Sequence, residues 1–180
     1  SSSNDIRDKT SNGVLSAIIP NILGSTTKSL VPANNKAGEV TTLTTTINKL
    51  SNALVSGDKI EIGPLPNNWI LNPDSSTTDC TITFEGNTKT VSSTSTSGTT
   101  IIVNLGESID ANEGNTVISC SNIKTGNQES DAISSITIAT KSSSNDIRDK
   151  TSNGVLSAII PNILGSTTKS LVPANNKAGE

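Results

Sequence analysis

The sequence predicts an all-β protein, an immunoglobulin-like antiparallel β-sandwich repeated in tandem. Two observations predict this fold. Residues 1–39 and 142–180 are identical at all 39 positions, at an offset of 141 residues, which is about the size of one domain. Residues 40–141 form a series of short β-branched segments separated by Gly, Asn, Pro and Ser turns. A jelly roll or a small barrel is the alternative arrangement.

The repeat divides the chain into residues 1–141, one full repeat, and 142–180, the start of the next identical repeat. Within the first repeat, 1–39 is a Ser-, Asn- and Pro-rich entry segment with a first strand, and 40–141 is the sandwich core. The apolar run at 13–20 ends at Pro20, which predicts a short strand at an edge. A short helix over 15–23 is the alternative, and Pro20 in its middle disfavours it.

The strands of the core are predicted from alternation between polar and apolar residues. Lys-Ile-Glu-Ile at 59–62 and Cys-Thr-Ile-Thr-Phe at 80–84 alternate cleanly, and each is bounded by a turn. The other predicted strands are 40–47, 69–71, 99–105, 116–120 and 136–138, with 89–91 as the return of a hairpin. Such spacing is typical of a sandwich with short connections.

The composition indicates a thin core and excludes several functions. Ser and Thr make up 53 of 180 residues, 31% of residues are hydrophobic, and only 1% are aromatic. The net charge of −3 offers no basic surface for nucleic acid. No run of 18 apolar residues is present, so we expect no membrane span in this fragment. Nothing in the sequence indicates a cofactor.

The two cysteines, Cys80 and Cys120, are predicted to form one disulfide per repeat. Each shares strand parity with apolar residues, so both thiols face the core, and disulfides are typical of extracellular proteins. Closing a loop of this length contributes roughly 3–4 kcal/mol. Two free buried cysteines are the alternative. A nucleophilic Cys needs a base such as His, and the chain contains no His.

One loop collects acidic residues and another stretch collects hydroxyls. Carboxylates in the loop around residue 110 are weak candidates for a calcium site, with solvated loop charges as the default interpretation. Ser/Thr-rich tracts are candidate O-glycan carriers, with a flexible hairpin loop as the alternative. No Asn-x-Ser/Thr sequon occurs. The calcium candidates are Glu107, Asp110 and Glu113; the O-glycosylation candidates are Ser92, Ser93, Thr94, Ser95, Thr96, Ser97, Ser142, Ser143 and Ser144.

Residues 56–62, Ser-Gly-Asp-Lys-Ile-Glu-Ile, are followed by Pro-Leu-Pro at 64–66. Together with residues 13–18, 41–46 and 136–140, this pattern resembles the tandem Ig-like, Ser/Thr-rich repeat proteins of microbial cell surfaces and extracellular glycosylated filaments, of protist or algal type. The resemblance covers nearly the whole repeat through short motifs. It implies a rod-like, secreted and often glycosylated array, and it implies no catalytic residue.

The function predicted from these features is mechanical: a subunit of an extracellular, O-glycosylated rod or filament, and not an enzyme. Its partners are neighbouring repeats of the same protein and covalent glycans. No long linker separates the repeats, so an apolar strand in 142–180 is expected to pair with the preceding domain, through Val155, Leu156, Ile159 and Ile160. The alternative is an adhesin module that binds a glycan or a surface protein. Its exposed aromatic residue would have to be Trp69, which we expect to be packed.

Overall fold

The computed structural model describes residues 21–22, 28–111 and 114–162. Its elements, in chain order, are β1 (Asn21–Ile22), β2 (Lys28–Pro32), β3 (Val40–Ile47), β4 (Lys59–Ile62), β5 (Ile70–Leu71), a 3-10 turn (Pro73–Ser75), β6 (Cys80–Phe84), β7 (Asn87–Lys89), β8 (Val91–Ser97), β9 (Thr100–Leu105), β10 (Thr116–Lys124), β11 (Ile133–Lys141) and β12 (Ile147–Leu156). The strand predicted at 13–20 lies outside the described residues.

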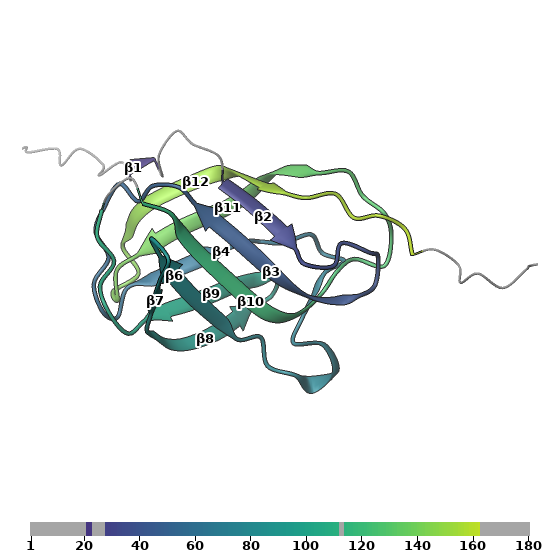
Figure 1. Ribbon diagram of the computed structural model, residues 1–180, viewed down its shortest axis with the longest axis horizontal. Helices are drawn as coiled ribbons and strands as arrows, with labels where there is room; N and C mark the ends of the chain where they lie inside the picture. Colours follow the sequence, from purple (N-terminus) through teal and green to yellow (C-terminus); the bar gives the residue numbers. More distant parts are fainter. Residues whose placement is uncertain (1–20, 23–27, 112–113, 163–180) are drawn as a thin grey trace, which may run out of the picture.

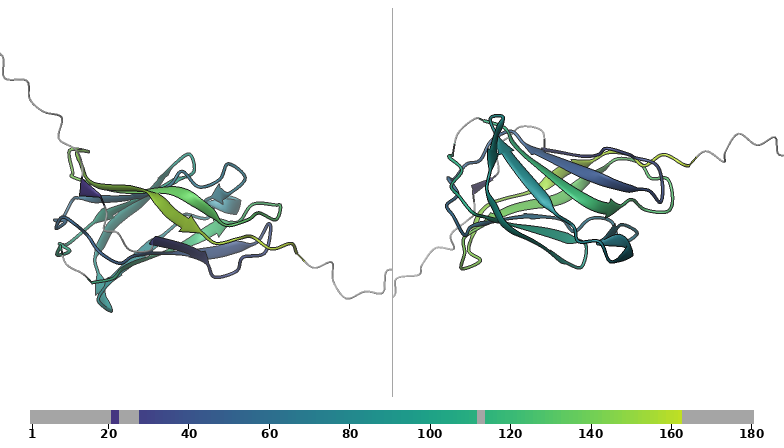
Figure 2. Two further views of the ribbon diagram at one scale, coloured as in Figure 1. Left: turned by 90° about the horizontal axis from the view of Figure 1, so that it is seen from above. Right: turned by 60° about the horizontal axis from the view of Figure 1, so that its bottom comes forward.

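The strands form two layers that face each other (Figures 1 and 2). In Figure 1 the front layer holds β6, β10, β3 and β2, and the rear layer holds β11, β4 and β9. Hydrogen bonds run continuously through both layers in the order β7-β6-β10-β3-β2-β12-β11-β4-β9-β8. The predicted all-β, immunoglobulin-like sandwich is therefore confirmed, and it is rolled partway toward a barrel.

Most predicted strands agree with the structure, but the hairpin return predicted at 89–91 lies at Asn87–Lys89, in β7. β3, β4 and β6 have the predicted bounds, whereas β10 and β11 run longer than predicted. Most strand pairs are antiparallel, but β12 pairs in parallel with β2 and with β1. Parallel strands cannot be joined by a tight hairpin, so β12 reaches β2 only because it comes from a distant part of the chain.

The core lies between the layers and is built from the inward face of each strand. Ile60 and Ile62 of β4 and Ile101, Val103 and Leu105 of β9 are buried, while the residues between them are partly exposed. Each such side chain contributes about 1.5–3 kcal/mol through burial. Trp69 is also buried, at 3% exposure, as its apolar neighbours predict.

β2 and β8 are among the strands that were not predicted from the sequence. Lys28–Pro32 forms β2, although Pro32 and its neighbours have the composition of a loop. The Ser/Thr tract forms β8, so the interpretation of this tract as a flexible loop is wrong. Both strands depend on pairing with a partner, β3 for one and β9 for the other, and that tertiary pairing outweighs weak local preference.

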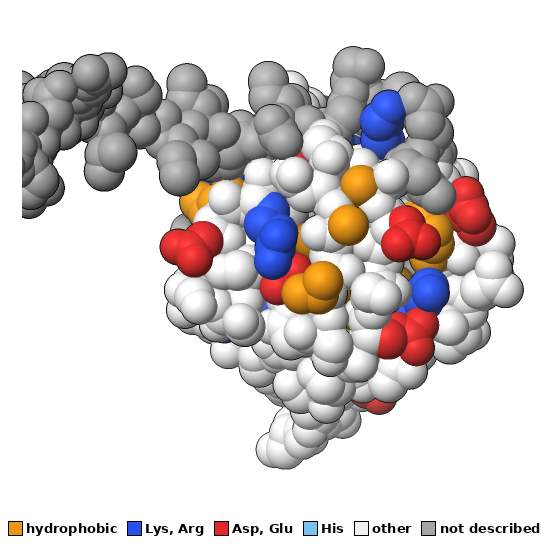
Figure 3. Space-filling view, turned by 90° about the vertical axis from the view of Figure 1, so that its left-hand side faces the viewer, with side chains coloured by type: hydrophobic (Ala, Val, Ile, Leu, Met, Phe, Trp, Pro, Cys, Tyr) orange, Lys and Arg blue, Asp and Glu red, His pale blue; other side chains and the backbone are white. Residues whose placement is uncertain are grey.

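The end face drawn in Figure 3 carries charged side chains of both signs. Acidic and basic side chains lie side by side there, with small separate apolar patches between them. Within the described residues, no helix has the length and apolar character needed to cross a lipid bilayer.

Candidate docking site

The start of the second copy of the 39-residue sequence lies in the same sandwich as the residues that precede it. We call residues 142–162 the docked segment and the described residues from 28 to 141 the acceptor. β12, within the docked segment, occupies the gap between β11 on one side and β2 on the other (Figure 1). It therefore joins the two layers into one sheet.

Backbone pairing holds the docked segment along its length. β12 pairs with β11 in an antiparallel ladder from Ile133 to Lys141, and Val155 and Leu156 pair with β2. Beyond the strand, the Ser157 amide donates to the Leu30 carbonyl at 3.0 Å. These bonds satisfy edge groups on both neighbouring strands, which would otherwise need water or another chain.

The docked segment stays attached past the end of β12. Ile159 exchanges two backbone hydrogen bonds with Ser130, at 2.9 and 3.0 Å. The Ile160 amide donates to the Asn35 carbonyl, and the Ile160 carbonyl accepts from the Ala37 amide, both at 2.9 Å. The extended contact therefore covers the connections before β3 and before β11 as well as the strands themselves.

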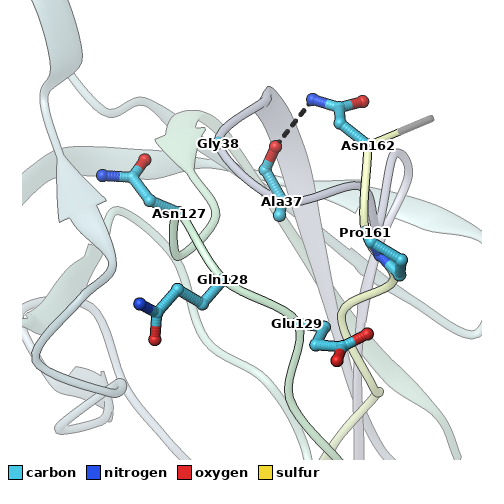
Figure 4. A pocket seen from close by; sticks show the side chains of 7 residues that line it. All are labelled: Ala37, Gly38, Asn127, Gln128, Glu129, Pro161 and Asn162. Atoms are coloured by element: carbon cyan, nitrogen blue, oxygen red, sulfur yellow. Dashed lines mark hydrogen bonds between the residues drawn. The ribbon is translucent and has the colours of Figure 1, made fainter. Parts of the chain in front are cut away.

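The far end of the docked segment borders an open depression of about 820 Å³. Asn162 donates from its side-chain nitrogen to the Ala37 carbonyl at 2.8 Å, the bond drawn in Figure 4, and to Glu39 Oε1 at 3.0 Å. The depression has no aromatic side chain; its lining residues are Ala37, Gly38, Asn127, Gln128, Glu129, Pro161 and Asn162.

The four apolar residues predicted to dock divide into two pairs. Leu156 and Ile159 are buried in the core at 1% and 3% exposure. Val155 and Ile160 are exposed at 36% and 45%. A strand directs successive side chains to opposite faces, so Val155 faces away from the core. Ile160 lies beyond the end of β12 and is held by its two backbone hydrogen bonds.

An acidic side chain of the docked segment is fully buried. The Asp149 carboxylate accepts three hydrogen bonds. The side-chain nitrogen of Asn52 donates to Oδ1 at 2.7 Å. The backbone amide of Asn52 and the hydroxyl of Thr140 donate to Oδ2, at 3.2 and 3.3 Å respectively. Its own amide donates to the Thr140 hydroxyl oxygen at 3.1 Å. Buried carboxylates persist only with such partners.

The neighbouring residue of the docked segment makes an ion pair with the acceptor. Arg148 Nε lies 3.1 Å from Asp58 Oδ2, outside hydrogen-bond geometry, and Nη2 donates to Asp58 Oδ1 at 3.3 Å. Asp58 is 1% exposed and also accepts from the Val55 amide at 2.9 Å, closing the turn in which Gly57 adopts a φ of 89°. The Ser-Gly-Asp motif thus builds a turn whose carboxylate faces the docked segment.

The hairpin between β11 and β12 carries three of the candidate glycosylation sites. Ser142 is partly exposed and is occupied by the turn, because its hydroxyl bonds the amide and carboxylate of Asp146 at 3.1 and 3.2 Å. Ser143 and Ser144 are exposed. The turn itself is held against β4 by Lys59, which donates to Asn145 Oδ1 at 2.7 Å.

The two cysteines form the disulfide that the sequence predicts. Cys80 on β6 and Cys120 on β10 are bonded, and they are also register partners in the antiparallel ladder. Both are buried. The bond therefore lies inside the front layer, and two strands, β3 and β2, separate β10 from β12 in the sheet order.

The hydroxyl tract on β8 presents alternate faces. Ser92, Ser93, Ser95 and Ser97 are exposed, whereas Thr94 and Thr96 are partly buried. The Thr94 hydroxyl accepts from the Cys80 amide at 3.2 Å, and the Thr96 hydroxyl accepts from Asn72 at 3.0 Å. Four of the six candidate residues therefore have side chains open to solvent.

The acidic loop does not assemble a metal site in the part of the chain that the structure describes, where no group of three potential ligands is found. Glu107 instead pairs with Lys89 at 3.2 Å and accepts from the Thr90 hydroxyl at 3.0 Å. The Thr90 hydrogen bond, and then Lys89, lower the pKa of Glu107. Asp110 is exposed, and Glu113 lies outside the described residues.

Comparison with known proteins gives only distant likeness. No family model matches the chain, and no curated protein matches it. A non-cellulosomal cohesin from the hyperthermophilic archaeon Archaeoglobus fulgidus is similar in structure, with a TM-score of 0.42, 13% identity, and coverage of 75% of this chain and 92% of that one. Two structures of the major pilin subunit of Bacillus cereus have TM-scores of 0.39 and 0.36 at 11% identity. This chain spans 39% and 36% of those pilin chains.

Sequence reasoning missed the polar half of the docking site. Arg148, Asp149, Asn52 and Asp58 have the types and spacing of ordinary solvated residues. The chain contains Arg only at positions 7 and 148, which are the same position of two identical copies, so this recurrence did not distinguish Arg148 from its neighbours.

Proposed function

We propose that the protein is a structural subunit of an extracellular tandem-repeat rod or filament, in which the entry segment of each repeat completes the sandwich of the repeat before it. The observation that carries this proposal is the position of β12. This strand belongs to the second copy of the repeated sequence, yet it lies within the sheet between β11 and β2. A segment that only linked two independent domains would not lie inside a sheet.

The energetics of the sheet support this proposal. Without β12, the facing edges of β2 and β11 would be bare, and Leu30 and Ile138, both 0% exposed, would lose part of their cover. Bare edges are sites of aggregation, and an added strand satisfies them with main-chain hydrogen bonds. The segment that follows each domain in the array removes that hazard.

The spacing of the repeat supports a closely packed joint. Position 28, where β2 begins, corresponds to position 169 in the second copy. Seven residue steps from Asn162 to Lys169 span at most roughly 25 Å. Consecutive domains in the array are therefore held near one another, as the stiffness of a rod requires.

An O-glycan coat is the second part of the proposal. The exposed hydroxyls of β8 lie on a strand at the end of the hydrogen-bonded order, and their side chains are open to solvent. Glycans there would also block edge-to-edge pairing between filaments. The disulfide is the kind of bond that persists in oxidising, extracellular surroundings.

The adhesin alternative has less support. It depended on an exposed aromatic residue, and Trp69 is buried. The depression at the end of the docked segment is lined by amides, one carboxylate and small residues. We therefore keep the structural role as the proposed function.

Electron microscopy of the native material tests the proposal directly. A strand of 10 residues such as β12 is about 33 Å long, so one sandwich with its connecting loops should advance the axis by about 40–60 Å. We expect thin filaments with that period and additional density over β8. Recombinant arrays of two, three and four repeats should lengthen in equal steps by small-angle scattering. Isolated globules, or arrays whose length does not grow with repeat number, would contradict the proposal.

A further inference from the structure

We propose that Arg148 and Asp149 form a polar lock that sets the register of the docked segment and selects a second copy of this same segment as its partner. This inference rests on the proposed function, because it concerns how the docking site recognises what it binds. The lock has two contacts, Asp149 with Asn52 and Thr140, and Arg148 with Asp58.

Main-chain hydrogen bonds alone distinguish weakly between registers. They recur along a strand whatever its sequence, and a slip of two residues returns the same side chains to the inward face. The short turn at 142–146 and the three register shifts in the β11–β12 ladder favour one register. A side-chain contact that distinguishes one residue from its neighbours two positions away strengthens that preference.

The Asp149 contact supplies that distinction. A slip of two residues places Ile147 or Thr151 opposite Thr140, where Asp149 stands in the structure. The Asn52 side-chain nitrogen and amide would then lose the carboxylate that they bind, and the carboxylate would move away from all three donors. Leaving buried polar groups unpaired is strongly unfavourable, so only one register satisfies them.

The contact between Arg148 and Asp58 adds a second side-chain interaction, one residue before the Asp149 contact. The register shift between Thr140 and Lys141 lets consecutive residues of β12 reach two different parts of the acceptor. Arg148 meets Asp58 in the turn before β4, whereas Asp149 meets Asn52 and Thr140. A competing strand must therefore carry a cation and an acid at adjacent positions. A single polar residue at a defined position fixes register in other assemblies in the same way.

The sequence identifies the segment that meets this requirement. Arg followed by Asp occurs only at 7–8 and at 148–149, the same position of the two copies. Every other strand of the chain lacks Arg, so none can reproduce both contacts. The partner that the lock selects is the entry segment of another copy, and strands from within the acceptor are excluded.

Thiol crosslinking in the full 180-residue chain tests the lock. Ala139 and Lys150 are register partners, so the pair A139C/K150C reports the observed register, and A139C/S152C reports a slip of two residues. Each pair is combined with the native lock and with R148Q/D149N. We expect the native lock to give the 139–150 disulfide alone, and the lock variant to give at least tenfold more of the 139–152 disulfide. The matched control R7Q/D8N makes the same changes in the first copy and should leave the pattern unchanged.

The outcomes separate the lock from the docking itself. A lock variant that still yields only the 139–150 disulfide, with an unchanged unfolding midpoint, overturns the lock and leaves docking intact. A folded native chain that forms neither disulfide overturns the proposed function as well. If R148Q/D149N does not fold, R148Q alone replaces it, because Arg148 is only partly buried. This single variant should give an intermediate yield of the 139–152 disulfide. If it gives none, the lock is again overturned.

Discussion

A Cβ atom placed on Gly154 of β12 would lie 2.7 Å from the carbonyl oxygen of Ile136 on β11. The register of the ladder shifts on either side of this pair, so the two backbones approach closely where the strands are irregular. Only glycine allows that approach, because the contact is with backbone and not with a side chain that can move aside. Gly154 thus fits the docked segment against the acceptor.

We expect Gly154→Ala to destabilise the domain by about 1–3 kcal/mol, the usual effect of forcing extra volume into a packed site. Urea unfolding of the full chain measures this. The matched control is Gly13→Ala, the same substitution in the first copy. Equal unfolding midpoints for the two variants would show that Gly154 does not face the acceptor as the structure indicates.

Replacing Leu156 with Ala should cost about 2–5 kcal/mol, because its side chain is buried and leaves a cavity. Val155→Ala should change the free energy of unfolding by less than about 1 kcal/mol, since Val155 faces solvent. Denaturant titration of the two variants compares adjacent positions of one strand. Leu15→Ala, the same substitution in the first copy, controls for a general effect of replacing Leu with Ala. Similar losses of unfolding free energy for Val155→Ala and Leu156→Ala would contradict the assignment of Val155 to the outer face and Leu156 to the core.

Replacing both Cys80 and Cys120 with Ala should lower the free energy of unfolding by about 3–4 kcal/mol. The two residues are 40 positions apart, and the bond restricts the unfolded chain over that loop. Guanidinium unfolding of the oxidised parent and the double variant gives the difference. Because β3 and β2 separate β10 from β12 in the sheet order, the crosslink between positions 139 and 150 should persist in the double variant; its disappearance would mean that docking depends on the front layer.

Burial lowers the pKa of Lys28 from its ordinary value of 10.5. Between the lowered value and 10.5, the unfolded chain binds more protons than the folded one, so stability should rise with pH across that alkaline window. Lys28→Met should remove this rise, and Lys169→Met, the same change in the second copy, should retain it. Unfolding midpoints measured from pH 8 to 11 test the point, and parallel curves for Lys28→Met and the parent would contradict it.

Glycan occupancy on β8 should follow exposure. We expect O-glycans in native material on the exposed residues Ser92, Ser93, Ser95 and Ser97, and not on Thr94 or Thr96, which are partly buried. Glycopeptide mass spectrometry with site-resolving fragmentation locates them. Uniform occupancy across the tract would indicate modification before folding, and an unmodified tract would remove glycosylation from the proposed function.

Sequence reasoning reached much of the fold because periodicity is a local property. Alternation at 59–62 and 80–84 placed β4 and β6, and the parity of Cys80 and Cys120 placed both thiols in the core. β8 escaped because a run of hydroxyl residues has no apolar alternation to detect.

The docking site was only half predictable for a different reason. The apolar run in 142–180 indicated a strand, but Asp149 meets Asn52 across 97 positions of sequence. A buried carboxylate has no local signature, because its burial depends on partners that the fold brings together. Val155 and Ile160 were assigned to the contact because they are apolar, whereas their side chains are exposed in the structure.

The parallel arrangement of β2 and β12 determines how an array would carry tension. A pulling force enters each domain through β1 and then β2, both parallel to β12, and leaves it at the end of the docked segment, so these strands are drawn past β12 along their length. Under such shear, the hydrogen bonds of β12 to β11 and β2 bear the load together, whereas a hairpin pulled open at one end loses them one after another. Each domain of the proposed filament would then resist stretching where the second copy of the repeated sequence pairs with the residues before it.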